Sequence, residues 1–82
     1  MITVVLYGRP DCHLCDLARE GLAGLRREGH PFRVREVDIE ADQDLLRRYL
    51  ERIPVVEVDG EVVSELYLDP AALLARLDTV HQ

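Results

Sequence analysis

The chain has 82 residues and a formal net charge of −6. A chain of this length forms one domain, residues 1–82, around a single core, and its acidity argues against nucleic-acid or anionic-membrane partners. No apolar stretch reaches the roughly 20 residues that a membrane span needs. The chain starts with a strand-like run rather than a basic, cleavable leader, so we expect a cytoplasmic protein, and we expect a monomer.

The first half of the chain predicts a strand, a helix and a second strand. Residues 2–7 are apolar almost throughout, which is typical of a strand covered on both faces. Residues 12–28 carry a helical stripe of apolar side chains, at Leu14, Leu17, Ala18, Leu22 and Leu25. Gly29 and Pro31 end this helix. Residues 32–39 alternate imperfectly and are rich in Arg and Glu, as expected of an edge strand.

Capping residues in the second half predict two further helices. Asp42 or Asp44 caps a short helix, which ends before Pro54 because the residue preceding a proline disfavours helical geometry. Asp69 and Pro70 supply the N-cap and the first residue of a final helix.

A hairpin lies between these two helices. Residues 55–58 and 61–64 are apolar runs joined by Asp59-Gly60, a dipeptide that favours a type I′ turn. The predicted order is therefore β-α-β-α-β-β-α. A right-handed crossover makes the first two strands parallel. We predict an α/β fold with a four-stranded mixed sheet and helices on both faces, which is the order of the minimal thioredoxin-like fold.

The two cysteines of the chain, Cys12 and Cys15, lie at the expected start of the first helix. Cysteines at this spacing in a first helical turn share one side, near the Cα separation of roughly 4.4–6.8 Å that a disulfide accepts. Unpaired N–H groups and the helix dipole favour the thiolate of Cys12. We predict that Cys12 attacks a partner disulfide and that the more buried Cys15 resolves the mixed disulfide.

Charged neighbours are candidates for tuning the pKa of Cys12. Arg9 adds a positive charge that could reach the sulfur or an anionic substrate, and Asp11 and Asp16 oppose it. His13 would stabilise the thiolate when it is protonated, and it would do little as a neutral surface side chain. An exposed His has a pKa of about 6.5 and is therefore mostly neutral at pH 7. We expect a modest tuning role for His13.

Two other interpretations of the cysteines stay open. A structural zinc site normally needs four ligands, and the sequence has no second C-x-x-C or paired His. We therefore predict no metal ligands within one chain, which leaves a zinc ion or an iron–sulfur cluster shared between two chains. The cysteines could also be inert buried thiols. In these cases the chain would be a binding module or a carrier rather than an enzyme.

Three stretches carry a resemblance to a known family. YGRPDCHLC at residues 7–15, RIPVV at 52–56 and VDG at 58–60 resemble the glutaredoxin family, and the similarity covers nearly the whole chain in element order and motif placement.

This resemblance implies roles for four residues. Cys12 matches the nucleophilic cysteine, and Arg9 matches a basic residue that helps to hold glutathione. Pro54 matches a cis proline that faces the dithiol. The backbone of Ile53 matches the segment that pairs with a bound peptide or glutathione.

The chain departs from the family at two places. His13-Leu14 stands where typical glutaredoxins have Pro-Tyr, and residues 63–67 stand where they have a Gly-Gly pair and an acidic residue that binds the glutathione amine. Ser64 and Glu65 are candidates to contact a substrate there, or they form a strand end and loop without a ligand.

We therefore expect a thiol–disulfide oxidoreductase without an intrinsic organic cofactor. Its expected substrate is a disulfide-containing protein. Its expected reductant is glutathione as a co-substrate or a thioredoxin-reductase system.

Overall fold

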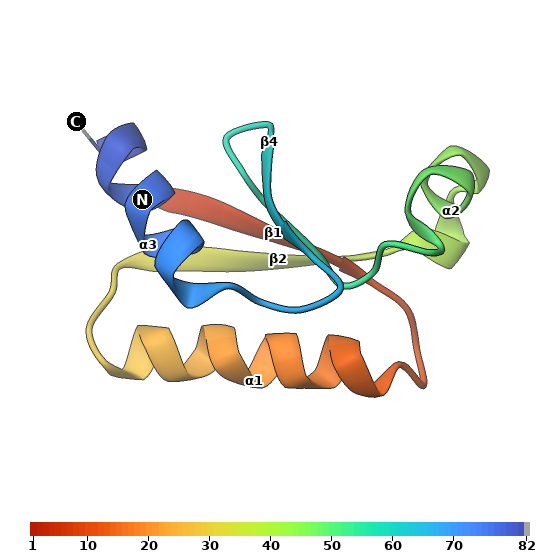
Figure 1. The fold of residues 1–82 in the computed structure, drawn as a ribbon, viewed down its shortest axis with the longest axis horizontal. Coiled ribbons are helices and arrows are strands. Elements are labelled where there is room, and N and C mark those ends of the chain that lie inside the picture. The colour runs from red at the N-terminus through yellow and green to blue at the C-terminus, as the bar shows by residue number, and fades with distance from the viewer. Residues whose placement is uncertain (82) are drawn as a thin grey trace.

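The computed structural model describes residues 1–81, which contain four strands, three α-helices and a short 3-10 helix. Their order along the chain (Figure 1) is β1 (Ile2–Gly8), α1 (His13–Arg27), β2 (Phe32–Asp38), η1 (Ile39–Ala41), α2 (Gln43–Tyr49), β3 (Val55–Val58), β4 (Glu61–Glu65) and α3 (Pro70–His81). Within this described part of the chain, no helix combines the length and the hydropathy of a membrane span.

The strands form one mixed sheet in the order β2-β1-β3-β4. Strand β1 runs parallel to β2 and antiparallel to β3, and β3 pairs antiparallel with β4. Strands β2 and β4 are therefore the edges, which accounts for the charged side chains of β2. The predicted α/β fold with a four-stranded mixed sheet is confirmed.

Different helices cover the two faces of the sheet. Leu6 of β1 and Val56 of β3 are register partners and pack in one cluster with residues of α1 and α3. Tyr7 and Val55, the next pair in the register, pack with Tyr49 of α2 in a second cluster. Because neighbouring residues of a strand point to opposite faces, α1 and α3 lie on one face and α2 lies on the other (Figure 1).

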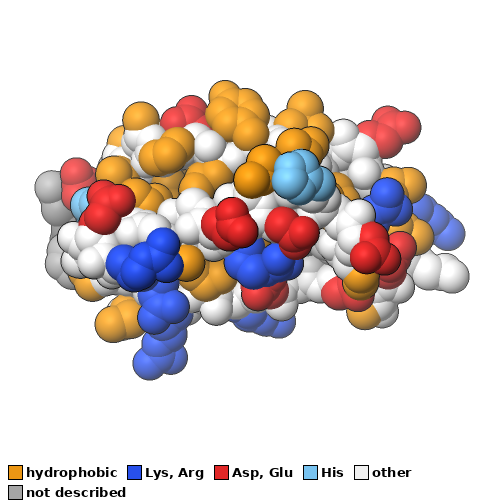
Figure 2. Space-filling model, turned by 90° about the horizontal axis from the view of Figure 1, so that it is seen from below, with side chains coloured by type: hydrophobic (Ala, Val, Ile, Leu, Met, Phe, Trp, Pro, Cys, Tyr) orange, Lys and Arg blue, Asp and Glu red, His pale blue; other side chains and the backbone are white. Residues whose placement is uncertain are grey.

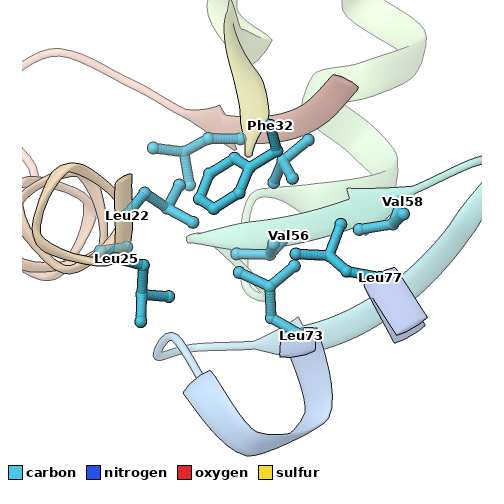
Figure 3. Packing of buried hydrophobic residues seen from close by; sticks show 10 residues of the cluster. Leu22, Leu25, Phe32, Val56, Val58, Leu73 and Leu77 are labelled. Atoms are coloured by element: carbon cyan, nitrogen blue, oxygen red, sulfur yellow. The ribbon is translucent and has the colours of Figure 1, made fainter. Parts of the chain in front are cut away.

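The larger core lies between the sheet, α1 and α3. Figure 3 shows side chains from both helices meeting those of β3 and the start of β2, among them Leu22, Leu25, Phe32, Val56, Val58, Leu73 and Leu77. Each such side chain contributes roughly 1.5–3 kcal/mol when it is fully buried. This core fixes α1 against the sheet and so fixes the position of its N-terminus.

Local side-chain chemistry sets the predicted helix starts and the hairpin turn. The carboxylate of Asp42 accepts two backbone N–H groups from the first turn of α2, at 2.8 and 3.2 Å, so Asp42 is the N-cap and Asp44 is not. Asp69 accepts a backbone N–H of α3 at 3.1 Å. Asp59 and Gly60 have φ values of 52° and 80°, the left-handed geometry that the hairpin turn requires.

Several element ends differ from the sequence prediction by one residue. Helix α1 begins at His13, and Cys12 is its N-cap. Strand β2 ends at Asp38 because the Asp38 carboxylate accepts the backbone N–H two residues later and starts a 3-10 turn at Ile39. Strand β4 extends to Glu65.

The apolar stripe of α1 is only partly buried, which corrects the sequence prediction. Leu14 and Leu17 are exposed over about half of their surface. The buried residues follow a narrower line along the helix, at Cys15, Ala18, Leu22 and Leu25. Leu14 and Leu17 lie beside this line, where neither the sheet nor α3 covers them fully.

Candidate active site

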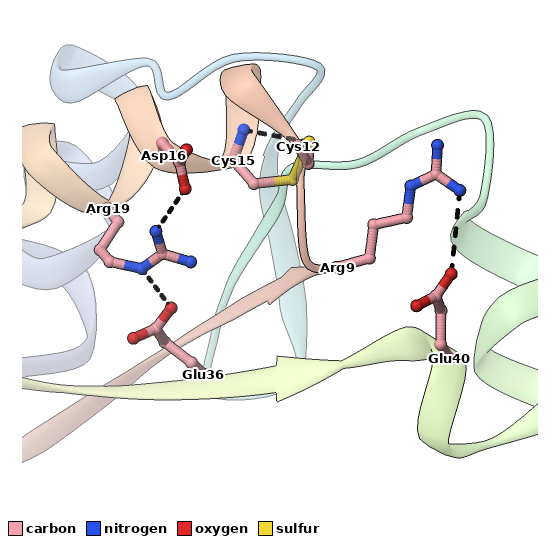
Figure 4. Close-up of a disulfide and its surroundings, with 7 residues drawn as sticks. All are labelled: Arg9, Cys12, Cys15, Asp16, Arg19, Glu36 and Glu40. Carbon is pink, nitrogen blue, oxygen red and sulfur yellow. Dashed lines mark hydrogen bonds and ion pairs between the residues drawn. A yellow bond between two sulfur atoms is a disulfide. The ribbon is translucent and has the colours of Figure 1, made fainter.

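Cys12 and Cys15 form a disulfide at the start of α1 (Figure 4). Their Cα atoms are 5.2 Å apart, inside the expected range. As the N-cap, Cys12 has an extended backbone, and its carbonyl accepts the backbone N–H of Asp16 at 3.0 Å. Its Sγ accepts the backbone N–H of Cys15 at 3.2 Å. The sulfur thus occupies the place that a Ser or Asp oxygen takes in an ordinary N-cap.

The two sulfur-bearing side chains differ in exposure. Cys12 is partly buried, whereas only 1% of the surface of Cys15 is exposed. Cys12 is therefore the accessible cysteine of the pair, and Cys15 is the more buried of the two, as predicted. The backbone N–H groups at the start of α1 and the positive end of the helix dipole lie at Cys12.

Gly8 makes room for Cys15. A Cβ atom on Gly8 would lie 3.0 Å from the Sγ of Cys15 and 3.2 Å from its Cβ, below the roughly 3.5–4.0 Å of an optimal carbon contact. The last residue of β1 therefore lies directly against the second cysteine. The sequence did not indicate this role of Gly8, because a close approach between a strand end and a helix has no local sequence signal.

Residues far along the chain lie beside the dithiol. Strand β3 pairs with the end of β1, which places Ile53 and Pro54 next to the loop that carries Cys12. The Ile53–Pro54 peptide bond is cis, as the family resemblance implied, and Pro54 is fully buried. Ile53 belongs to the same buried cluster as Cys15. Its N–H donates to the carbonyl of Tyr49 at 3.0 Å, so a bound peptide would pair with this N–H only by replacing that bond.

Arg9 and His13 flank the disulfide in different ways. The guanidinium of Arg9 lies 3.9 Å from the carboxylate of Glu40, and in Figure 4 its side chain extends away from the sulfur atoms. Arg9 would have to exchange this ion pair to reach a substrate. His13 is the first residue of α1 and is exposed.

Ser64 and Glu65 lie at the end of β4, where the resemblance implied a glycine pair. Ser64 is buried, and its hydroxyl has no hydrogen-bond partner among the described residues. Glu65 accepts two hydrogen bonds from the guanidinium of Arg52, the longer of 3.1 Å. These bonds hold the pKa of Glu65 below its usual value of 4.5. The carboxylate is thus already occupied by a partner that sequence analysis did not assign to it.

A cavity of about 340 Å³ borders the buried side of the disulfide, next to Gly8 and Cys15. Arg19 crosses its edge and joins Asp16, at 2.7 Å, to Glu36 (Figure 4). The hydrogen bond to Glu36 is the main cause that raises the pKa of Arg19.

Among the side chains that the structure describes, no group of three or more His, Cys, Asp or Glu is arranged to hold a metal ion.

Comparison with known proteins gives a consistent set of relatives. Residues 3–78 match the glutaredoxin-like domain (DUF836), and no curated protein matches the sequence. A structural-genomics target protein from X. campestris, solved by X-ray crystallography, is 38% identical; the match covers 93% of this chain and 96% of that one, with a TM-score of 0.71. An NMR structure of a Nitrosomonas europaea protein is 27% identical over 92% and 89% of the two chains, with a TM-score of 0.76. A malarial protein shares only the fold, at 14% identity over 96% of each chain and a TM-score of 0.66.

Proposed function

We propose, because this chain belongs to the family of glutaredoxin-like domains, that it is a thiol–disulfide oxidoreductase whose redox centre is the Cys12–Cys15 pair. One observation carries the proposal: the two cysteines are bonded at the N-terminus of α1 with only Cys12 open to a partner. A purely structural disulfide has no need for an accessible sulfur at the positive end of a helix.

The reaction follows from this asymmetry. In the reduced protein, the Cys12 thiolate attacks one sulfur of a partner disulfide. The partner S–S bond breaks, a mixed disulfide forms, and the leaving thiolate takes a proton from water. Cys15 then loses its proton and attacks the Sγ of Cys12, which releases the second partner thiolate. Two electrons pass to the partner, and the Cys12–Cys15 disulfide remains.

The residues around the pair have supporting roles in this proposal. His13, exposed beside Cys12, stabilises the thiolate when it is protonated. Arg9 offers a positive charge to an anionic group that displaces Glu40. Pro54 and Ile53 are buried, and in this proposal they shape the substrate groove through their backbone. Ser64 is buried and Glu65 is held by Arg52, which supports a structural role for this strand end more than direct contact with substrate.

The oxidised pair has to be reduced again for a second turnover. Glutathione and a thioredoxin-reductase system are the two candidate reductants, and both suit a reducing compartment such as the cytoplasm. Because the carboxylate of Glu65 is paired with Arg52, a glutathione amine would compete with an existing ion pair. This pairing supports the thioredoxin-reductase system as the reductant.

Turnover with each reductant tests the proposal. The purified protein is mixed with a protein disulfide substrate and NADPH, once with glutathione and glutathione reductase and once with thioredoxin and thioredoxin reductase. NADPH consumption that depends on the wild-type protein, and that Cys12→Ser abolishes, supports an oxidoreductase. No consumption in either mixture, or a coloured protein whose absorbance disappears in Cys12→Ser, indicates a binding module or a carrier of a shared cluster instead.

A further inference from the structure

An apolar groove runs along α1 beside the dithiol. It has a volume of about 260 Å³, and none of its lining residues carries a charge. One wall comes from the first turns of α1, the other from the loop between β4 and α3, and the side chain of Leu68 closes over Gly21 between them. We call it the α1 groove and define it by Leu14, Leu17, Gly21, Leu66, Tyr67 and Leu68.

The apolar side chains that form the walls of the α1 groove expose about half of their surface or more. Leu14, Leu17, Leu66 and Tyr67 expose between 49% and 62% of their surface. In Figure 2, which views the molecule from the side of α1, hydrophobic side chains gather along the upper edge while charged side chains occupy the middle. Exposed apolar residues that gather around a hollow, rather than lying scattered, mark an interaction site.

The backbone of Leu66 is held in a strained conformation. Its φ of 70° is a left-handed value that a bulky side chain rarely adopts. Its N–H donates to the carbonyls of Arg52, at 3.0 Å, and of Pro54, at 2.9 Å, so the neighbouring loop enforces this conformation. Strain of this kind persists where the surrounding structure imposes it, and it is common at sites that hold a ligand. Here it directs a leucine side chain outward beside the cis proline.

The size and charge of the α1 groove restrict its occupant. Its volume is below the roughly 300–1,000 Å³ of pockets that enclose small organic ligands, so a single apolar side chain fits it better. No residue that lines the groove is charged, so the carboxylates and the amine of glutathione would find no opposite charge there. An apolar side chain fills the groove without leaving a charge unpaired.

We propose that the α1 groove receives an apolar side chain that flanks the reacting cysteine of a protein substrate. This inference rests on the disulfide exchange proposed above and names its substrate class. Leu14 lies between the two cysteines in sequence and lines the groove, so a polypeptide joined to Cys12 through a disulfide passes beside it. The occupant is therefore a residue close in sequence to the substrate cysteine.

A single-turnover assay with matched peptides tests this inference. Two peptides carry one cysteine each, linked as a mixed disulfide to 2-nitro-5-thiobenzoate, with leucine on both sides of the cysteine in one peptide and serine in the other. Release of the coloured thiol reports attack by Cys12 of the pre-reduced protein, because the thiol of lower pKa leaves faster. The wild-type protein should react at least about tenfold faster with the leucine peptide at low peptide concentration.

Leu66→Gly is the informative variant, because glycine accepts a φ of 70° without strain and removes only the side chain. It should reduce the preference for the leucine peptide to within about twofold, and Tyr67→Ser, a second variant on the same wall, should also reduce it. Leu50→Ala is the matched control, since Leu50 is an exposed leucine that does not line the α1 groove. It should keep the wild-type preference.

The outcomes separate this inference from the proposed function. Equal rates for the two peptides in the wild-type protein, or an unchanged preference in both Leu66→Gly and Tyr67→Ser, would overturn the groove as a substrate site while leaving disulfide exchange intact. Release from neither peptide, and none from a peptide-free 2-nitro-5-thiobenzoate disulfide, would overturn the exchange reaction and the groove proposal together.

Discussion

Gly8→Ala should displace the resolving cysteine. The new methyl group would lie 3.0 Å from the Sγ of Cys15, and neither partner can move easily, because Gly8 ends a paired strand and Cys15 is fully buried in α1. Relief to an ordinary contact requires a shift of about half an ångström or more. Crowding of this kind in a packed interior typically costs about 1–3 kcal/mol. We expect the free energy of unfolding in urea to fall by that amount.

The same shift should slow the reaction at one defined step. Attack by Cys12 on a model disulfide should stay near the wild-type rate, whereas resolution by Cys15 should slow about tenfold, because a misplaced reacting atom loses its near-attack geometry. Quenched-flow mass spectrometry of the mixed disulfide separates the two steps.

Gly24→Ala is the matched control. A Cβ atom at Gly24 would meet only the flexible end of Arg27, at 3.7 Å, so alanine in this helix position should stabilise the protein by about 0.5–1 kcal/mol. If Gly8→Ala were as stable as the wild-type protein and resolved the mixed disulfide at the same rate, the assignment of Gly8 as the space for Cys15 would be wrong.

Two further changes test the end of β4. Ser64→Ala should leave stability unchanged or raise it, because the Ser64 hydroxyl is buried without a partner and its removal abolishes an uncompensated desolvation cost. A melting temperature that falls by several degrees in this variant would reveal a hydrogen bond to Ser64. Glu65→Gln should flatten the dependence of stability on pH. The pKa of Glu65 is lowered in the folded protein, so its contribution is present above its unfolded pKa and is lost as the pH falls through the folded value. Melting temperatures measured between about pH 3 and pH 7 should therefore fall more steeply on acidification in the wild-type protein than in Glu65→Gln, and parallel curves would contradict the role of the Arg52 pair.

Local chemistry made much of the fold predictable. Asp42, Asp69 and the Asp59-Gly60 turn act through hydrogen bonds and φ values within a few residues, so the sequence contains the whole cause. The position of the dithiol at a helix start was predictable for the same reason. The cis Pro54 was expected only through the family resemblance, because most X-Pro bonds are trans and composition alone favours that form.

Contacts between distant residues were not predictable. Arg52 and Glu65 meet because β3 and β4 pair in one register, and Arg9 meets Glu40 only after the crossover from β1 to β2. Helical periodicity showed that Leu14 and Leu17 share a side of α1, but it did not show how much of that side the rest of the chain covers. The exposed walls of the α1 groove therefore emerged only from the tertiary structure.

The most direct test of the central claim is the trapping of the mixed disulfide. Pre-reduced Cys12→Ser and Cys15→Ser proteins are mixed with a disulfide-bonded peptide and analysed by intact mass. The account predicts that Cys15→Ser accumulates one peptide per protein, joined to Cys12, that Cys12→Ser accumulates little, and that the wild-type protein passes on to the Cys12–Cys15 disulfide with release of the reduced peptide. Equal trapping by both variants, or trapping only through Cys15, would contradict the assignment of Cys12 as the attacking residue.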